Sequence, residues 1–218
     1  MNSNEIDIEN LHELYEQHYE IGELIYSCCN GNVYPMDLYT FSALDRSLHN
    51  LAGFQLLLKE DNYLCALPVL RMQLDTLMRY WAFLLVDDAH DFAYEIFCGK
   101  PVKKIKDRKN KYLTDLYIVE NIKKLNPWIE QVYKVCCSYV HFSDSHIRTL
   151  IANSPVEAES NSRMLTFSFK DSNIPKEDKM DVIIAFNPTT QVNYFFLAPN
   201  PFFGYITQQT RKMEVTHA

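Results

Sequence analysis

Residues 63–86, YLCALPVLRMQLDTLMRYWAFLLV, carry the most regular apolar pattern in the chain. Large apolar side chains recur there at intervals of three and four residues, at Leu67, Leu70, Leu74, Leu77, Trp81 and Leu84. This spacing places them in one seam along a helix, and such a seam requires another helix to cover it. Pro68 lies near the start, so the helix is expected to begin near that residue or to kink there. The stretch predicts a long helix inside a bundle.

Helical patterns flank this seam on both sides. Upstream, residues 5–28 and 36–59 repeat apolar positions at helical spacing, and Gly31 and Pro35 separate the two segments. Downstream, three shorter helices are expected, at residues 89–97, 114–124 and 127–142. The last of these should begin at Asn126 and Pro127, because asparagine caps helices and proline suits the first helical position.

The helical period is lost after His146. Residues 147–152 and 163–169 have the composition of strands and enclose a polar stretch, which predicts a small antiparallel β-hairpin. Further short helices are expected at residues 178–186, 189–197 and 202–213. We therefore expect a mainly α protein, with a bundle of five to seven helices in residues 1–150. Residues 151–218 would supply the hairpin and short helices packed on that bundle.

The composition supports a helical globular protein. The 218 residues include only 5 glycines, against 14 tyrosines and 13 phenylalanines, which disfavours disorder and turn-rich β folds. Basic residues number 21 and acidic residues 28, giving a net charge of −7. A protein that coats nucleic acid or anionic lipid normally has a basic surface, so any such partner would need a local basic site.

The chain also lacks the usual signals for export or metal binding. Its N-terminal residues are acidic and amphipathic, and no apolar run approaches the ~18 residues of a membrane span. The six cysteines contain no C-x2-C spacing, which disfavours a zinc ribbon. We expect a reduced cytoplasmic protein with no metal, no cofactor and no membrane contact.

The long helix carries one charged stripe beside its apolar seam. Arg71, Asp75 and Arg79 follow one another at intervals of four, so their side chains lie along one edge of the helix. They could be weak, exposed ion pairs. Alternatively, a charged stripe on a largely buried helix must find partners, and buried charges often serve function. Arg71, Asp75 and Arg79 are therefore candidate catalytic residues.

Residues 139–146, YVHFSDSH, concentrate reactive groups where a helix should end. Histidine changes charge near neutral pH, so His141 or His146 could move a proton, with Ser143 assisting. The Ser-Asp-Ser sequence also makes an ordinary turn or helix cap, so a structural role stays open. A zinc site here is disfavoured, because no further ligand has suitable spacing.

Residues 100–111, KPVKKIKDRKNK, contain seven basic residues in twelve. The simplest interpretation is a solvated surface, but on an acidic protein this loop is also where a phosphate-bearing partner, RNA or a nucleotide, would bind. The candidate ligand-binding residues are Lys100, Lys103, Lys104, Asp115 and Tyr139.

The segments LPVLRMQLDTLMRYWAFLLVDD, GKPVKKIKD, YLTDLYIVENIKKL and YVHFSDSHI resemble, in this order over residues 45–150, a group of uncharacterised bacterial helical proteins. The resemblance implies recurring polar positions at Arg71, Asp75, Arg79, Asp115, His141, Ser143 and His146. The layout is remotely similar to HEPN-type helical domains, which include RNA-cleaving toxins and phage-defence effectors. HEPN nucleases carry an R-x4–6-H motif, usually completed across a dimer. The sole match here, Arg211 to His217, is attributed to chance.

Two functions follow from these observations. One is an HEPN-like, metal-independent ribonuclease acting as a toxin or phage-defence effector, in which Arg71 or Arg79 meets His141 or His146 across the bundle. The arginines would stabilise phosphate charge while a histidine moves a proton. The other is a non-catalytic interaction or ligand-binding module, whose arginines, aspartates and histidines form a buried polar network. The apolar surface of the long helix also predicts a homodimer.

Overall fold

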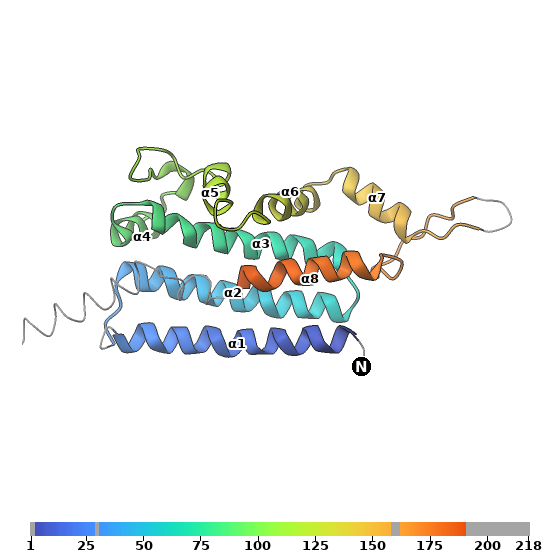
Figure 1. Ribbon diagram of the computed structural model, residues 1–218, viewed down its shortest axis with the longest axis horizontal. Coiled ribbons are helices and arrows are strands. Elements are labelled where there is room, and N and C mark those ends of the chain that lie inside the picture. Colours follow the sequence, from blue (N-terminus) through green and yellow to red (C-terminus); the bar gives the residue numbers. More distant parts are fainter. Residues whose placement is uncertain (1–2, 29–30, 158–161, 191–218) are drawn as a thin grey trace, which may run out of the picture.

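The computed structural model describes residues 3–28, 31–157 and 162–190 (Figure 1). The α-helices within these ranges are α1 (Ser3–Cys28), α2 (Pro35–Lys59), α3 (Tyr63–Ala82), α4 (Ala89–Phe97), α5 (Asp115–Ile122), α6 (Ile129–Val140), α7 (Asp144–Asn153) and α8 (Lys176–Thr190). Two short 3-10 turns, at Phe83–Leu85 and Val102–Lys104, complete the elements of this part of the chain. The prediction of a mainly α protein is confirmed.

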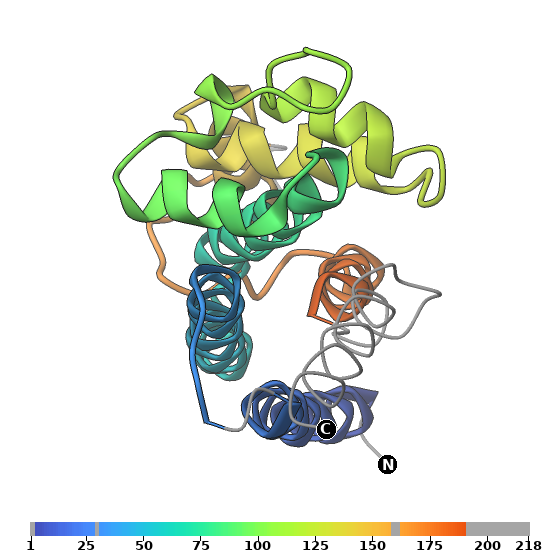
Figure 2. The same cartoon turned by 90° about the vertical axis from the view of Figure 1, so that its left-hand side faces the viewer.

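Four long helices form one half of the molecule. Seen end-on in Figure 2, α1, α2, α3 and α8 surround a common interior, and each packs against the next in that order, with α8 closing back onto α1. Helices α1, α2 and α3 alternate in direction, whereas α8 runs parallel to α3. An ion pair between Lys179 and Asp61 joins the starts of α8 and α3.

The shorter helices form a second layer on the outer side of α3. Helices α5 and α6 pack against α3, α4 packs against α2, and α7 packs against α6 (Figure 2). Helix α3 therefore belongs to the four-helix group and also carries the second layer, so it has neighbours on most of its circumference. Its buried seam residues, Leu67, Leu70, Leu74 and Leu77, confirm the predicted apolar face.

Two apolar clusters make up the core, and α3 contributes to both. The first contains Leu74, Leu77 and Met78 of α3 with residues of α1, α2, α4 and α5. The second contains Leu67 and Leu70 of α3 with residues of α1, α2, α6 and α8. In the second cluster the rings of Phe54 and Phe186 stack with their centroids 3.9 Å apart, which fixes α8 on α2.

Local capping explains most helix boundaries. The side chain of Asn62 accepts a hydrogen bond from the Cys65 amide and begins α3 five residues before Pro68, so α3 contains this proline near its N-terminal end. Thr114 caps α5 in the same way. Helix α6 begins at Ile129, after Trp128, rather than at the predicted Asn126–Pro127 start.

The structure corrects two predictions in the C-terminal third. Residues 147–152, predicted as a strand, belong to α7, and no strand forms within the described ranges; Val156 and Arg163 make an isolated antiparallel bridge. Helix α8 continues to Thr190 through the expected boundary at Asn187–Pro188. The helix predicted at 202–213 and most of that at 189–197 lie outside the described residues.

Candidate functional site

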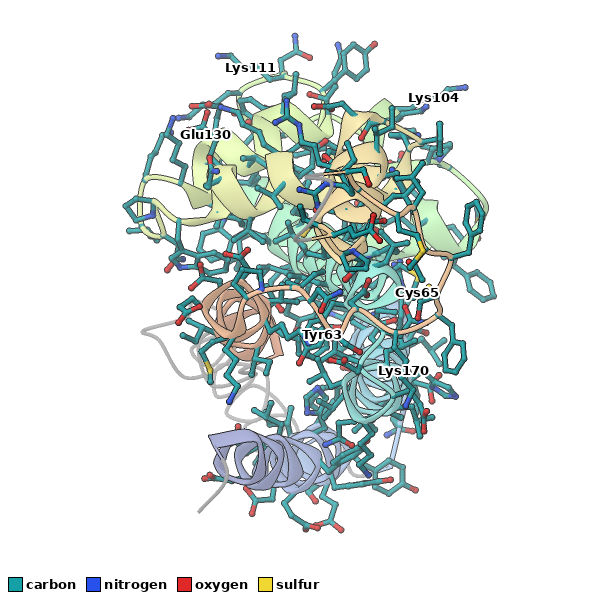
Figure 3. The ribbon with its side chains drawn as sticks, turned by 90° about the vertical axis from the view of Figure 1, so that its right-hand side faces the viewer. Tyr63, Cys65, Lys104, Lys111, Glu130 and Lys170 are labelled. Carbon is teal, nitrogen blue, oxygen red and sulfur yellow. The ribbon has the colours of Figure 1, made fainter. Side chains whose placement is uncertain are left out.

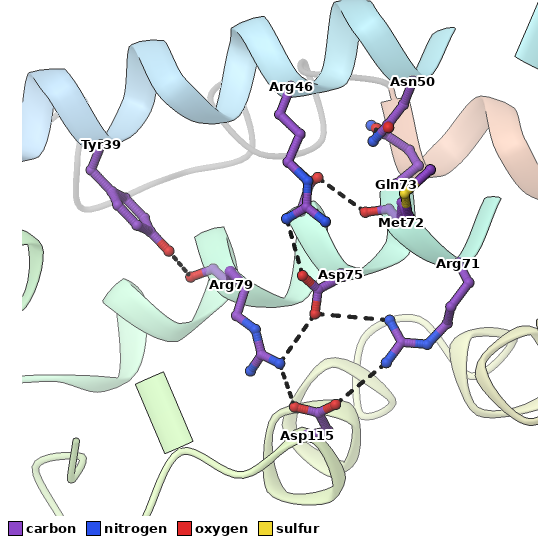
Figure 4. Close-up of polar contacts among 10 residues, drawn as sticks. Tyr39, Arg46, Asn50, Arg71, Met72, Gln73, Asp75, Arg79 and Asp115 are labelled. Atoms are coloured by element: carbon purple, nitrogen blue, oxygen red, sulfur yellow. Dashed lines mark hydrogen bonds and ion pairs between the residues drawn. The ribbon is translucent and has the colours of Figure 1, made fainter. Parts of the chain in front are cut away.

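The charged stripe of α3 is held together by ion pairs within the helix. Asp75 lies between the two arginines, with its Oδ1 atom 3.1 Å from Nη2 of Arg79 and 3.8 Å from Nη1 of Arg71 (Figure 4). The exposed fractions are 14% for the Arg71 side chain, 22% for Asp75 and 25% for Arg79. The stripe is therefore mostly covered by neighbouring helices, unlike a solvated surface pair.

Two residues from other helices join this stripe. Asp115, the first residue of α5, bridges both arginines, with carboxylate oxygens 3.3 Å from Nη2 of Arg71 and 2.6 Å from Nη2 of Arg79. Arg46 of α2 reaches Asp75 from the other side, at 3.1 Å. We call Arg46, Arg71, Asp75, Arg79 and Asp115 the arginine–aspartate cluster (Figure 4). With three guanidinium groups and two carboxylates it carries one net positive charge.

The arginines of this cluster have further partners. The Arg71 guanidinium lies over the Tyr133 ring at 4.7 Å and donates from Nε to Sγ of Cys137, 3.4 Å away. The Tyr39 hydroxyl donates to the backbone carbonyl of Arg79. Nη1 of Arg79 is buried without a hydrogen-bond partner among the described residues. All three guanidinium nitrogens of Arg71, and Nη2 of Arg79, therefore contact other groups of the protein.

The predicted histidine segment forms the turn between α6 and α7. Ser143 caps α7, and its hydroxyl donates to the carbonyl of Ser138. The Ser143 amide in turn donates to Nδ1 of His146, 3.2 Å away. This bond completes a capping box at the start of α7. Ser143 and His146 thus have a local structural role at the start of α7.

The structure does not join the histidines to the arginine–aspartate cluster by contact. No hydrogen bond or ion pair links Arg71 or Arg79 to His141 or His146 within the described ranges. His141 is exposed at the C-terminal cap of α6, one turn after Cys137, which Arg71 contacts. The predicted catalytic residues therefore divide into two groups, and Cys137 lies between them along the chain.

The basic loop contains one arginine with a clear structural role. Arg108 donates three hydrogen bonds to the carbonyl oxygens of residues 84–86, at 2.6 to 3.2 Å. These carbonyls belong to the 3-10 turn Phe83–Leu85 that follows α3 and to its cap residue Val86. Arg108 therefore caps this turn, which continues from the long helix.

The lysines of this loop are only partly available to a ligand. Lys100 pairs with Glu95 at 2.7 Å, and two others lie over tyrosine rings, Lys106 over Tyr112 and Lys111 over Tyr117. Figure 3 shows Lys104 and Lys111 at the outer edge of the second layer. Three of the loop's six lysines have no ion pair or ring contact in the described part of the chain: Lys103, Lys104 and Lys109.

A cavity that the sequence did not indicate lies between α3, α6, α7 and α8. Its volume is about 800 Å³, and its walls are mainly apolar. The lining side chains include Leu67, Leu70, Trp128, Val132, Tyr139 and Ala185. Of the predicted ligand-binding residues, only Tyr139 lines it. The cavity brings together segments more than a hundred residues apart, so no local pattern could have revealed it.

The cavity wall contains few groups suited to chemistry. Burial raises the pKa of the Cys136 thiol to about 12, so this cysteine is a neutral apolar wall residue. The Tyr139 hydroxyl lies 3.4 Å from Oγ1 of Thr149, at the long limit of a hydrogen bond. Thr149 itself donates to the carbonyl of Ser145. Within the described residues, the Tyr139 phenol therefore has only this weak hydrogen bond and can take a further partner.

A second polar network was also missed. His18 donates from Nδ1 to a carbonyl one turn earlier in α1, which leaves Nε2 to accept from the Ser47 hydroxyl at 2.7 Å. Gln73 of α3 donates to Ser47 and to the carbonyl of Thr189, and accepts from Asn50. These buried side chains connect α1, α2, α3 and α8. The sequence feature that could have indicated this network is His18, a histidine on an otherwise apolar face of α1.

Other kinds of site find no support in the part of the chain that the structure describes. It contains no group of three or more histidine, cysteine, aspartate or glutamate residues arranged to hold a metal ion. None of its helices is long and apolar enough to cross a membrane. No known family model, curated protein or solved structure matches the chain, so its function has to be inferred from the geometry of these residues.

Proposed function

We propose that the protein is a non-catalytic helical module that binds a small, mainly apolar molecule in the cavity between α3, α6, α7 and α8. The cavity itself carries this proposal. Its volume of about 800 Å³ falls within the ~300–1,000 Å³ typical of small-molecule sites. Such sites combine apolar and aromatic walls with a few polar groups, here Tyr139 and the charged residues at the rim.

The contacts of the candidate catalytic residues also favour this function. A phosphate-stabilising arginine needs donors free for the substrate, whereas the guanidinium groups of Arg71 and Arg79 are engaged by Asp75 and Asp115. Their role is to hold α5 against α3, which in turn positions α6 and the cavity wall. In this proposal the arginine–aspartate cluster is a structural network.

The test uses Trp128, which lines the cavity, as a fluorescent reporter in a Trp81→Phe background. We expect 1-decanol, a neutral apolar probe, to change the Trp128 emission in a saturable manner. Val135→Phe should obstruct the cavity and weaken binding at least fivefold. Val140→Phe, on the same helix but outside the cavity lining, is the matched control and should leave binding unchanged. Equal binding by both variants would contradict the proposal.

A second candidate is the metal-independent ribonuclease, in the class of toxins and phage-defence effectors. One observation favours it. His141 is exposed and lies one helical turn after Cys137, which Arg71 contacts. An imidazole there could accept a proton from an RNA 2′-hydroxyl, a step that requires no metal. For RNA to bind there, Arg71 would have to release Asp75 or Asp115 and contact a phosphate group of the RNA instead.

The ribonuclease is tested by incubating the protein with total RNA in the presence of EDTA. Cleavage that is lost in His141→Ala but retained in His49→Ala, a change at another exposed histidine, would establish a nuclease centred on His141. Absence of cleavage by the wild-type protein would reject this candidate. The predicted homodimer is tested separately, by sedimentation equilibrium of the same preparation.

A further inference from the structure

The charged residues at the cavity rim indicate the chemistry of the ligand. Four of them line the cavity: Arg148 of α7 and Asp178, Lys179 and Asp181 of α8. Each of the two cations already has an ion-pair partner within the protein. Arg148 pairs with Asp144 at 3.0 Å, and Lys179 pairs with Asp61 at 2.5 Å while lying over the Tyr63 ring.

The two rim aspartates differ from these cations. Asp178 and Asp181 are exposed, and neither has an ion pair within the described ranges. They are three residues apart on α8, so their carboxylates lie on neighbouring positions of one helix face. Asp178 belongs to the first turn of α8, where a negative charge also stabilises the helix, whereas Asp181 lies beyond that turn. The rim therefore carries two uncompensated negative charges beside an apolar cavity.

We propose that the ligand is an amphiphilic amine, whose apolar body fills the cavity and whose protonated amine lies at Asp178 and Asp181. This inference rests on the proposed function, because it names the ligand class of the same cavity. The apolar body would pack against Leu67, Leu70 and Val132, and the ammonium group would remain partly hydrated at the rim. A carboxylate ligand is disfavoured, since it would face two aspartates while Arg148 and Lys179 are already paired.

The test compares three probes with the same ten-carbon chain, each below its critical micelle concentration at pH 7.5. These are decylammonium, 1-decanol and decanoate, all followed by Trp128 emission in the Trp81→Phe background. Two partly solvated charges should each contribute modestly, so we expect decylammonium to bind about fivefold tighter than 1-decanol. Decanoate should bind more weakly than 1-decanol.

A double variant isolates the aspartates. Asp178→Asn with Asp181→Asn should weaken decylammonium binding to the level of 1-decanol and leave 1-decanol binding unchanged, which shows that the cavity is intact. Glu177→Gln, on the same helix but outside the cavity lining, removes one negative charge as the control and should preserve the preference for the amine. Raising the salt concentration should reduce the preference as well.

The possible outcomes separate this inference from the proposed function. If 1-decanol binds but decylammonium binds no tighter, or the double asparagine variant keeps the preference, the amine is rejected and the cavity remains a binding site. Tighter binding of decanoate than of 1-decanol would also reject the amine. If none of the three probes binds, both the amine and the ligand-binding module are rejected.

Discussion

Asp115 lies 2.6 Å from Nη2 of Arg79, although 36 residues separate them along the chain. The same carboxylate also contacts Arg71, so one aspartate at the start of α5 connects two positions eight residues apart on α3. This contact joins the second layer of helices to the long-helix bundle. Four predictions follow from the contacts described above.

Removing the Asp115 charge should destabilise the protein. Asp115→Asn leaves two largely buried guanidinium groups sharing Asp75, and we expect a loss of about 1–3 kcal/mol in the free energy of unfolding, between the values for exposed and buried ion pairs. Asp45→Asn is the matched control, because Asp45 pairs with His49 where both side chains are more than 70% exposed. The control should change stability by less than about 0.5 kcal/mol. Urea unfolding of both variants decides the question, and equal effects would mean that the cluster contributes nothing beyond a surface pair.

The buried His18 should make the protein less stable in mild acid. Burial lowers the pKa of His18, against the opposing effect of its hydrogen bond to the Leu14 carbonyl, so the folded state favours the neutral imidazole. As the pH falls below the ordinary histidine pKa of about 6.5, the unfolded chain takes up a proton that the folded protein resists. The free energy of unfolding should therefore decrease from that pH downward until the lowered pKa is reached.

The pH effect is measured as the difference in unfolding free energy between pH 7.5 and pH 5.5. His18→Gln should reduce this difference, although it also destabilises the protein at pH 7.5 by about 1–3 kcal/mol through the lost buried hydrogen bonds. His49→Gln, at an exposed histidine, should retain the wild-type difference. An unchanged difference in His18→Gln would show that His18 does not cause the acid sensitivity.

The stacked pair Phe54 and Phe186 should dominate the attachment of α8. Phe186→Ala removes a completely buried ring and should cost about 3–5 kcal/mol of stability. Phe167→Ala makes the same chemical change at a ring that is 89% exposed, and it should be nearly neutral. Thermal and urea unfolding provide the measurement. A small effect at Phe186 would mean that α8 contributes little to the folded core.

Arg108 should matter for stability more than its lysine neighbours. Arg108→Ala removes three hydrogen bonds to carbonyl groups in the turn that follows α3, and we expect a loss of about 1–3 kcal/mol. Lys104→Ala, in the same basic loop, should have no measurable effect on unfolding. If the two variants behave alike, the capping contacts of Arg108 add no stability and the loop acts only as a basic surface.

The sequence predicted the long helices because their apolar seams are periodic and their ends carry recognisable caps. Residues 147–152 were misassigned as a strand because the run is short and aliphatic, and the cap that starts this helix pairs Ser143 with His146 rather than with the usual glutamate or glutamine. The break expected between the helices at 178–186 and 189–197 is absent, because an asparagine followed by proline, here Asn187–Pro188, is only a local preference for a helix start. Tertiary packing against α3 overrides it in α8.

The candidate site was predictable only in part. The spacing of Arg71, Asp75 and Arg79 correctly placed them on one stripe, since helical geometry is local. Their partner Arg46 could not be identified, because it comes from another helix 29 residues before Asp75 in the chain. The cavity rim was hidden for the same reason, as α7 and α8 meet α6 only in the folded protein.

The position of α3 in both core clusters determines which parts of the molecule can unfold locally. Because α3 packs against helices of both layers, exposing its middle to solvent requires separating it from partners in both, so the backbone amides there should exchange with deuterated water only through global unfolding. Helix α7 buries a single residue, Thr149, and its amides should exchange through local opening. That opening would loosen one wall of the cavity while the rest of the bundle stays closed, which gives a ligand a route of entry that costs far less than unfolding.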